Sequence, residues 1–256
     1  MLMLKLLLVP LFLSLVSLAS ARWGPAIGGW LAGLPVVGGP ILFLLAIERG
    51  PVFAADSAVA ALNGLCGAIA FALVYAWAAV RLSWLESAIS AVGAWLMVTA
   101  VLAVARPGLA VGALLVTVIL FLVPRCFPTP LPFRPAVVLG RRELGLRMLA
   151  GALLTLFTTA VARPLGPTLT GMLAVFPILT LILAVFSHRN SGAGFCTILL
   201  RSMMGGLYSF VGFCVVLALT IPRLGTYTGF AVAVAAALGM HGLVRRWGMA
   251  RRRMPR

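Results

Sequence analysis

Few residues in this sequence could carry acid–base or metal chemistry. The chain of 256 residues contains only four acidic residues and two histidines. His188 and His241 have no Cys, Asp or Glu at the spacing of a metal site, and no nucleophile or phosphate-loop motif is present. The sequence therefore predicts a protein that is not an enzyme and that has no cofactor and no metal site.

A charged residue within an apolar stretch is the strongest remaining candidate, because a charge in hydrocarbon is costly and often functional. Arg201 is the clearest example. If its helix begins near Ala193, Arg201 lies about 12 Å deep at 1.5 Å per residue. The guanidinium could then extend to the interface, or pair with Glu86, which begins a predicted helix on the same side.

Three other polar residues are candidates of lower rank. Asp56 is expected in the first turn of a helix, where the helix dipole favours an acid, with a pathway carboxylate as the alternative. Asn63 and Tyr208 lie beside glycines in apolar stretches, where they could line a substrate site or form hydrogen bonds between helices.

The backbone itself supplies a further candidate site. Glycines and prolines are dense between residues 24 and 40, so the middle of this segment, 33–40, is not expected to form a continuous helix. Broken helices in membranes expose backbone groups only toward protein or a water-filled cavity. We therefore expect Pro35, Gly38 and Gly39 to contribute to a substrate site, with Pro177 and Thr180 from the matching segment of the second half. A kinked packing helix with small residues is the alternative.

The composition identifies the solvent in which these elements fold. Hydrophobic residues make up 63% of the chain and charged residues 9%, against about a quarter charged in soluble domains. The sequence therefore predicts an integral membrane protein. The four cysteines show no paired spacing, so we interpret them as small apolar side chains; they are Cys66, Cys126, Cys196 and Cys214.

Division of the sequence at its charged residues leaves segments long enough to be membrane helices. We predict an all-α fold with nine transmembrane helices. Between the fifth and sixth, residues 124–147 are rich in proline and arginine and form a predicted linker. The predicted helices are 6–21, 23–47, 57–80, 87–105, 107–124, 148–162, 164–188, 202–222 and 224–244.

The two halves of the chain match each other at a shift of 142 residues. Thirteen identities fall within about 56 positions, and six of them are Gly or Pro, among them Gly24/Gly166, Pro35/Pro177 and Gly50/Gly192. Composition shared by membrane segments is the alternative explanation. The match predicts four helices in 1–106, a connecting helix and linker in 107–143, and four helices in 144–256. One extra helix between the units inverts the second unit, as in many transporters.

The distribution of basic residues predicts the orientation. With a cytoplasmic C-terminus and nine spans, the N-terminus is outside, 14 cations including Arg147 lie on the cytoplasmic side, and five lie outside. The net charge of +16 therefore indicates a basic rim facing anionic lipid and not a nucleic-acid surface. An alternative is a signal peptide cleaved after Ala21, which would reverse this distribution.

Both halves resemble the GlpM family of small bacterial inner-membrane proteins of about four helices. The resemblance is carried by Leu34-Pro35 and Phe176-Pro177, each 15 residues before a glycine, and by Glu48-Arg49-Gly50. The second half has lost the acidic member of that triplet. The resemblance implies a fused, inverted pair of units in the bacterial inner membrane and a link to envelope polysaccharide production.

Two functions follow as expectations. The first is a transporter or permease for a small or lipid-linked substrate, with a site between the broken helices. The alternative is an accessory or scaffold subunit that binds another membrane protein of an envelope-polysaccharide complex. The scarcity of polar residues favours an apolar substrate or no substrate.

Overall fold

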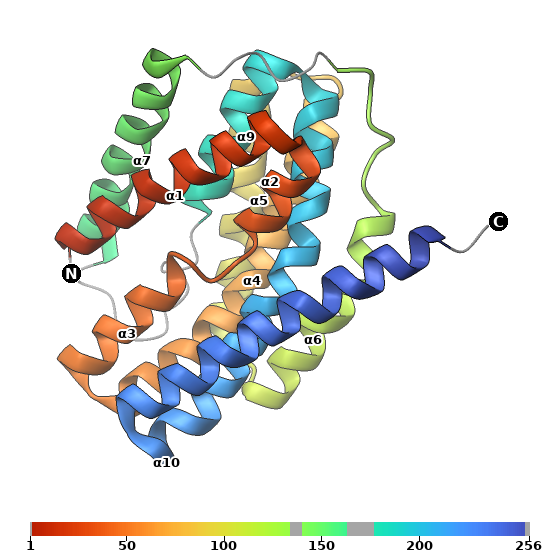
Figure 1. The fold of residues 1–256 in the computed structure, drawn as a ribbon. Helices are drawn as coiled ribbons and strands as arrows, with labels where there is room; N and C mark the ends of the chain where they lie inside the picture. Colours follow the sequence, from red (N-terminus) through yellow and green to blue (C-terminus); the bar gives the residue numbers. More distant parts are fainter. Residues whose placement is uncertain (1, 134–139, 163–176, 254–256) are drawn as a thin grey trace.

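The computed structural model describes residues 2–133, 140–162 and 177–253, and every regular element within these ranges is a helix (Figure 1). In chain order the elements are α1 (Leu2–Trp23), α2 (Pro25–Ala32), α3 (Gly38–Arg49), α4 (Pro51–Ala79), α5 (Trp84–Ala105), α6 (Leu109–Leu122), the short 3₁₀ helix η1 (Val123–Arg125), α7 (Arg141–Ala162), α9 (Ile178–Ser191) and α10 (Ala193–Arg253).

Four of the described helices, α1, α4, α5 and α10, are long and apolar enough to cross a membrane. Helices satisfy their backbone groups internally, which hydrocarbon requires. The prediction of an all-α fold is thus confirmed for the described residues, and four of their helices have the length and apolar character of membrane spans, while nine spans remain a prediction.

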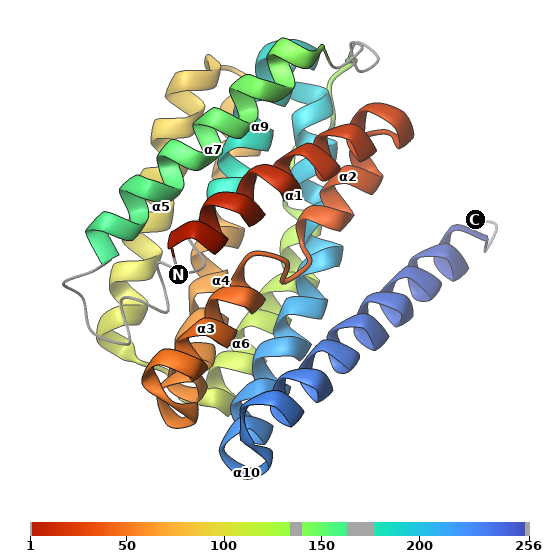
Figure 2. The same ribbon diagram turned by 60° about the vertical axis from the view of Figure 1, so that its left-hand side comes forward.

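The longest helix, α10, folds back on itself. Its apolar stretch Ala193–Val244 contains 52 residues, about 78 Å of helix against about 30 Å of hydrocarbon. Gly225 interrupts it with φ 77° and ψ 175°, three residues after Pro222. Residues 193–224 (the first arm) and 226–253 (the second arm) therefore run in opposite directions (Figures 1 and 2).

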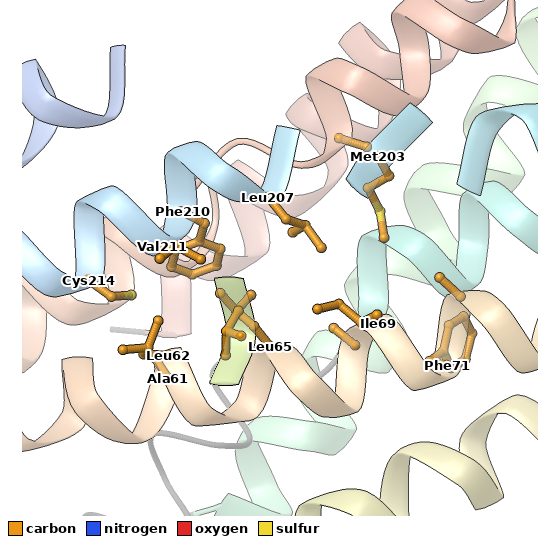
Figure 3. Packing of buried hydrophobic residues seen from close by; sticks show 14 of the residues in the cluster. Ala61, Leu62, Leu65, Ile69, Phe71, Met203, Leu207, Phe210, Val211 and Cys214 are labelled. Atoms are coloured by element: carbon orange, nitrogen blue, oxygen red, sulfur yellow. The ribbon is translucent and has the colours of Figure 1, made fainter. Parts of the chain in front are cut away.

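The core forms where α4 contacts the first arm of α10. Leu65 and Ile69 of α4 are buried near Leu207 of α10, and Leu62 lies near Val211 and Cys214 of the same arm (Figure 3). Of the four candidate spans α4 is the most buried, whereas α5 is mostly exposed at the bundle surface. Three of the four cysteines are buried in apolar surroundings, as their positions predicted.

Glycines bring α2 unusually close to the first arm of α10. A Cβ built on Gly29 would lie 1.9 Å from the Leu199 carbonyl oxygen, and one on Gly33 would lie 2.6 Å from Gly206. A Cβ on Gly206 would lie 2.2 Å from the Trp30 carbonyl oxygen. Dispersion between backbones holds such small-residue contacts together in membranes.

Two helix boundaries differ from the sequence prediction, and a third agrees with it. Helix α7 begins at Arg141, so Arg147 lies within a helix and not in the predicted 124–147 linker. Asp56 lies in the second turn of α4 and is exposed, because this helix already begins at Pro51. Glu86 is in the first turn of α5, as predicted, where it forms a capping box with Ser83.

Parts of the predicted repeat lie outside the described residues. These are Gly166, Pro167, Gly171, Leu173 and Ala174 of the second copy, together with Arg134, Arg163 and Arg256 of the charge count.

Substitution of neighbouring glycines tests the α2–α10 contact. We expect Gly206→Ala to lower the free energy of unfolding by about 1–3 kcal/mol, because the added methyl group forces two backbones apart. The matched control is Gly205→Ala, whose Cβ would meet only Trp30 Cδ1 at 3.6 Å. It should be neutral or stabilise by up to about 1 kcal/mol through helix propensity. Unfolding by SDS in mixed micelles provides the measurement, and equal effects of the two variants would contradict the close contact.

Candidate functional site

The predicted helix break is present between α2 and α3. Residues 33–37 are not helical, and α3 begins at Gly38. Backbone hydrogen bonds of the helical type begin again where the Gly39 amide donates to the Pro35 carbonyl at 2.8 Å. The break is therefore shorter than the predicted segment 33–40, because Gly38, Gly39 and Pro40 already belong to the first turn of α3.

An apolar cavity of about 550 Å³ lies beside this break, between α3 and the two arms of α10. Its size is that of a typical ligand pocket. No lining residue is charged. The lining residues are Leu34, Pro35, Val36, Gly39, Pro40, Phe43, Phe213, Phe230, Ala231, Val234, Ala237 and Leu238.

Aromatic rings from distant parts of the chain form the wall of this cavity. The rings of Phe43 and Phe230 meet edge to face with centroids 5.0 Å apart, and those of Phe213 and Phe230 with centroids 6.0 Å apart. Gly39 lies against the Phe213 ring at an ordinary contact distance, 3.5 Å from a built Cβ. Its missing side chain leaves the cavity open at this point.

Of the predicted site residues, Pro35 and Gly39 line the cavity, whereas Gly38 packs against the Phe210 ring outside its lining. Pro177 directly precedes α9, whereas its counterpart Pro35 lies three residues before the start of α3. Thr180 of α9 is buried, and its hydroxyl donates to the Met203 sulfur of α10 at 3.3 Å.

Asn63 and Tyr208 lie apart from the cavity lining. The Asn63 amide donates to the Pro107 carbonyl at 2.8 Å and joins α4 to the loop before α6. Tyr208 is half-buried near Arg125. The hydrogen bond of Asn63 agrees with the interhelical alternative that the sequence left open.

The structure does not bring Arg201 and Glu86 together as a pair. The Glu86 carboxylate accepts hydrogen bonds from the Ser83 amide at 2.9 Å and the Ser83 hydroxyl at 2.7 Å. Arg201 is exposed on the surface of the bundle. Of the two alternatives for Arg201, the structure therefore does not show the pair with Glu86, whose carboxylate takes part in the capping box.

A buried polar cluster that the sequence did not predict joins α1, α7 and α9. Arg147 is 5% exposed and forms an ion pair with Glu143, one turn earlier in α7. The Arg147 guanidinium also donates to the Ser17 hydroxyl at 3.0 Å and lies 5.1 Å from the Phe186 ring centroid. Asn190 donates to the same Glu143 oxygen at 2.6 Å.

The sequence does not predict this cluster, because Arg147 is expected at the end of the 124–147 linker and not within a helix. The signal in the sequence is the Glu143–Arg147 spacing of four residues, which places both on one helix face. That spacing is also common on exposed helix faces, so its burial could not be read from the sequence.

A second unpredicted cluster joins both arms of α10 to α2. His241 of the second arm is buried, its Nδ1 lies 3.2 Å from the Ser209 hydroxyl, and its ring stacks on Trp30 with centroids 3.4 Å apart. Ser209 also donates to the Gly206 carbonyl. The cluster therefore holds the second arm of α10 beside the place where α2 and the first arm are in close contact. Among the described residues, no group of three or more His, Cys, Asp or Glu side chains could hold a metal ion.

Comparisons with known proteins give no relative from which an activity could be transferred. No protein family model, no curated protein and no solved structure matches this chain.

Removal of Glu143 tests the cluster around Arg147. We expect Glu143→Ala to lower the free energy of unfolding by about 2 kcal/mol, because the buried guanidinium loses its charged partner. The double variant Glu143→Ala/Arg147→Met should recover most of this loss, since no unpaired charge then remains. SDS unfolding of both variants measures the difference.

The exposed Arg81 provides the control, because Arg81→Met should leave the unfolding midpoint unchanged. If the double variant is less stable than Glu143→Ala, the ion pair does not have the assigned role.

Proposed function

We propose that this protein is a membrane transporter or permease built from two inverted four-helix units and one connecting helix. The observation that carries the proposal is the break at residues 33–37, which borders a cavity inside a bundle of membrane-length helices. Interrupted helices beside a cavity are typical of substrate sites in transporters with inverted repeats.

The glycines that end the two segments carrying the GlpM resemblance have the same backbone conformation. Gly50 separates α3 from α4 with φ 91° and ψ 167°, and Gly192 separates α9 from α10 with φ 88° and ψ 172°. These glycines correspond at the 142-residue shift, as do Pro35 and Pro177. Only glycine adopts this conformation without strain, so the agreement supports a duplicated unit and its likeness to the GlpM family.

Side-chain contacts in the two long hairpins support the same register. Ser209 and His241 meet between the arms of α10. The shift of 142 relates them to Gly67 of α4 and Thr99 of α5, and these also meet, with a Cβ on Gly67 only 2.7 Å from the Thr99 hydroxyl oxygen.

The directions of the helices support inversion. In Figures 1 and 2, α1 and α7 lie side by side and run in opposite directions, as do α4 and the first arm of α10. These are the pairs that the shift of 142 relates. A two-fold axis in the membrane plane would produce this arrangement.

We further propose that the protein lies in the bacterial inner membrane with an external N-terminus and a cytoplasmic, basic C-terminal end. Thirteen of the fourteen cations predicted on the cytoplasmic side, all except the buried Arg147, support this orientation through the positive-inside rule and attraction to anionic lipid. The retained α1 is supported by the Ser17–Arg147 hydrogen bond, which cleavage after Ala21 would remove.

Transport by the purified protein in liposomes tests the proposed function. A panel of small solutes and fluorescent lipid-linked compounds should contain at least one whose movement across the membrane requires the protein. For that compound we expect Gly39→Leu to reduce the rate about tenfold or more, because its side chain would fill part of the cavity, and Pro35→Ala to reduce it as well.

Gly93→Leu is the matched control, because Gly93 lies in α5 with nothing within 4 Å of a built Cβ. It should transport at the rate of the original protein. Absence of flux over the whole panel, with Pro35→Ala silent in cells and a membrane protein that co-purifies, would instead favour the scaffold function.

Cysteine labelling in spheroplasts tests the orientation. With Cys126 replaced by Ser, a membrane-impermeant maleimide should label Gly108→Cys and leave Leu82→Cys unlabelled. These positions lie at opposite ends of α5, and the N-outside orientation places residue 108 externally. The reverse labelling pattern would contradict the orientation.

A further inference from the structure

We infer that the cavity between α3 and α10 binds the hydrocarbon chain of a lipid, acyl or prenyl. This assignment names the substrate class of the proposed transporter and therefore rests on that function. The chemical character of the wall is the first argument. An ion or sugar in this cavity would lose its hydration and gain no charged partner, because every side chain in the lining is apolar.

The cavity is accessible from the side of the bundle. Val234 and Leu238 of the second arm line it, and they are 47% and 62% exposed at the bundle surface. In a bilayer this surface contacts lipid tails and not water. A chain could therefore enter past these two residues without leaving hydrocarbon.

A second apolar cavity supports the assignment. It has about 480 Å³ and lies between α5, α7 and α9. Ile182 and Val185 line it at the positions that correspond to Pro40 and Phe43 of the first cavity. Ala88 corresponds to Phe230 in the same way.

The side chains at these corresponding positions differ, but all of them are apolar. The two halves thus have apolar cavities at corresponding positions, and the two cavities differ in shape. This is the pattern expected when the occupant is a flexible chain and not a solute of fixed shape.

Photochemical labelling of the purified protein tests the inference. The probe is a phospholipid with a diazirine in one acyl chain, incorporated in liposomes of phosphatidylethanolamine and phosphatidylglycerol. Extraction into detergent before irradiation removes loosely held surface lipid. We expect peptide mass spectrometry to find label in residues 40–43 and 230–238 several-fold above the exposed α5 surface around Met97.

Two variants connect the label to the cavity. Gly39→Leu should remove the label from both segments, and Gly93→Leu should retain it. Val234→Gln places a polar group at the exposed edge, where it does not threaten folding, and should also reduce the label several-fold. Label spread in proportion to exposed area, or unchanged in Gly39→Leu and Val234→Gln, would overturn the inference.

Competition identifies the source of the chain. Excess unlabelled polyprenyl phosphate that displaces the probe more strongly than unlabelled phospholipid would assign a prenyl chain, and the reverse order an acyl chain. Because labelling measures binding alone, labelled protein without flux would contradict the transporter and leave the chain site standing. Flux without specific labelling would contradict the chain site alone.

Discussion

Backbone amides and carbonyls without partners are too costly to expose to lipid, and this constraint organises the molecule. The cost of unpaired backbone groups explains why the described membrane-length segments are helical. It also makes the non-helical residues 33–37 exceptional. A break in the backbone at membrane depth has to be surrounded by protein. Neighbouring helices provide this surrounding in part: Gly33 is buried, and residues 34–37 are half-buried beside the cavity.

Two kinds of contact surround the break. On one side, glycines of α2 and α10 allow the backbones to touch, with Gly33 against Gly206. On the other side, Phe210 and Phe213 lie against the glycines that begin α3. Small residues fix the position of α2, and aromatic rings leave space beside α3. The cavity therefore forms where, within a few residues, the contact of backbone with backbone at α2 changes to a contact of backbone with aromatic rings at α3.

Much of this fold could be predicted from the sequence because glycine, proline and charge have local effects. Gly50 and Gly192 end helices, and the break near Pro35 follows from residues within a few positions of it. The partners of these elements could not be predicted in the same way. Phe213 and Phe230 reach the cavity from a helix almost 200 residues away in sequence, and nothing local distinguishes them from rings that face lipid. Arg147 was misplaced for the same reason, since its burial depends on α1 and α9.

The positions of the polar clusters bear on how such a molecule could move. The Arg147 cluster joins α1 of the first half to α7 and α9 of the second, and Trp30 and His241 join α2 to the second arm of α10. Both clusters and both apolar cavities thus lie between the halves, since α3 contributes to one cavity with α10, and α5 to the other with α7 and α9. Hydrogen bonds in a low-dielectric interior are directional and lost abruptly when partners separate, but apolar contacts change gradually with displacement. Rocking of the halves would therefore be resisted at the clusters and tolerated at the cavities, and an apolar chain could remain bound while the surrounding helices shift.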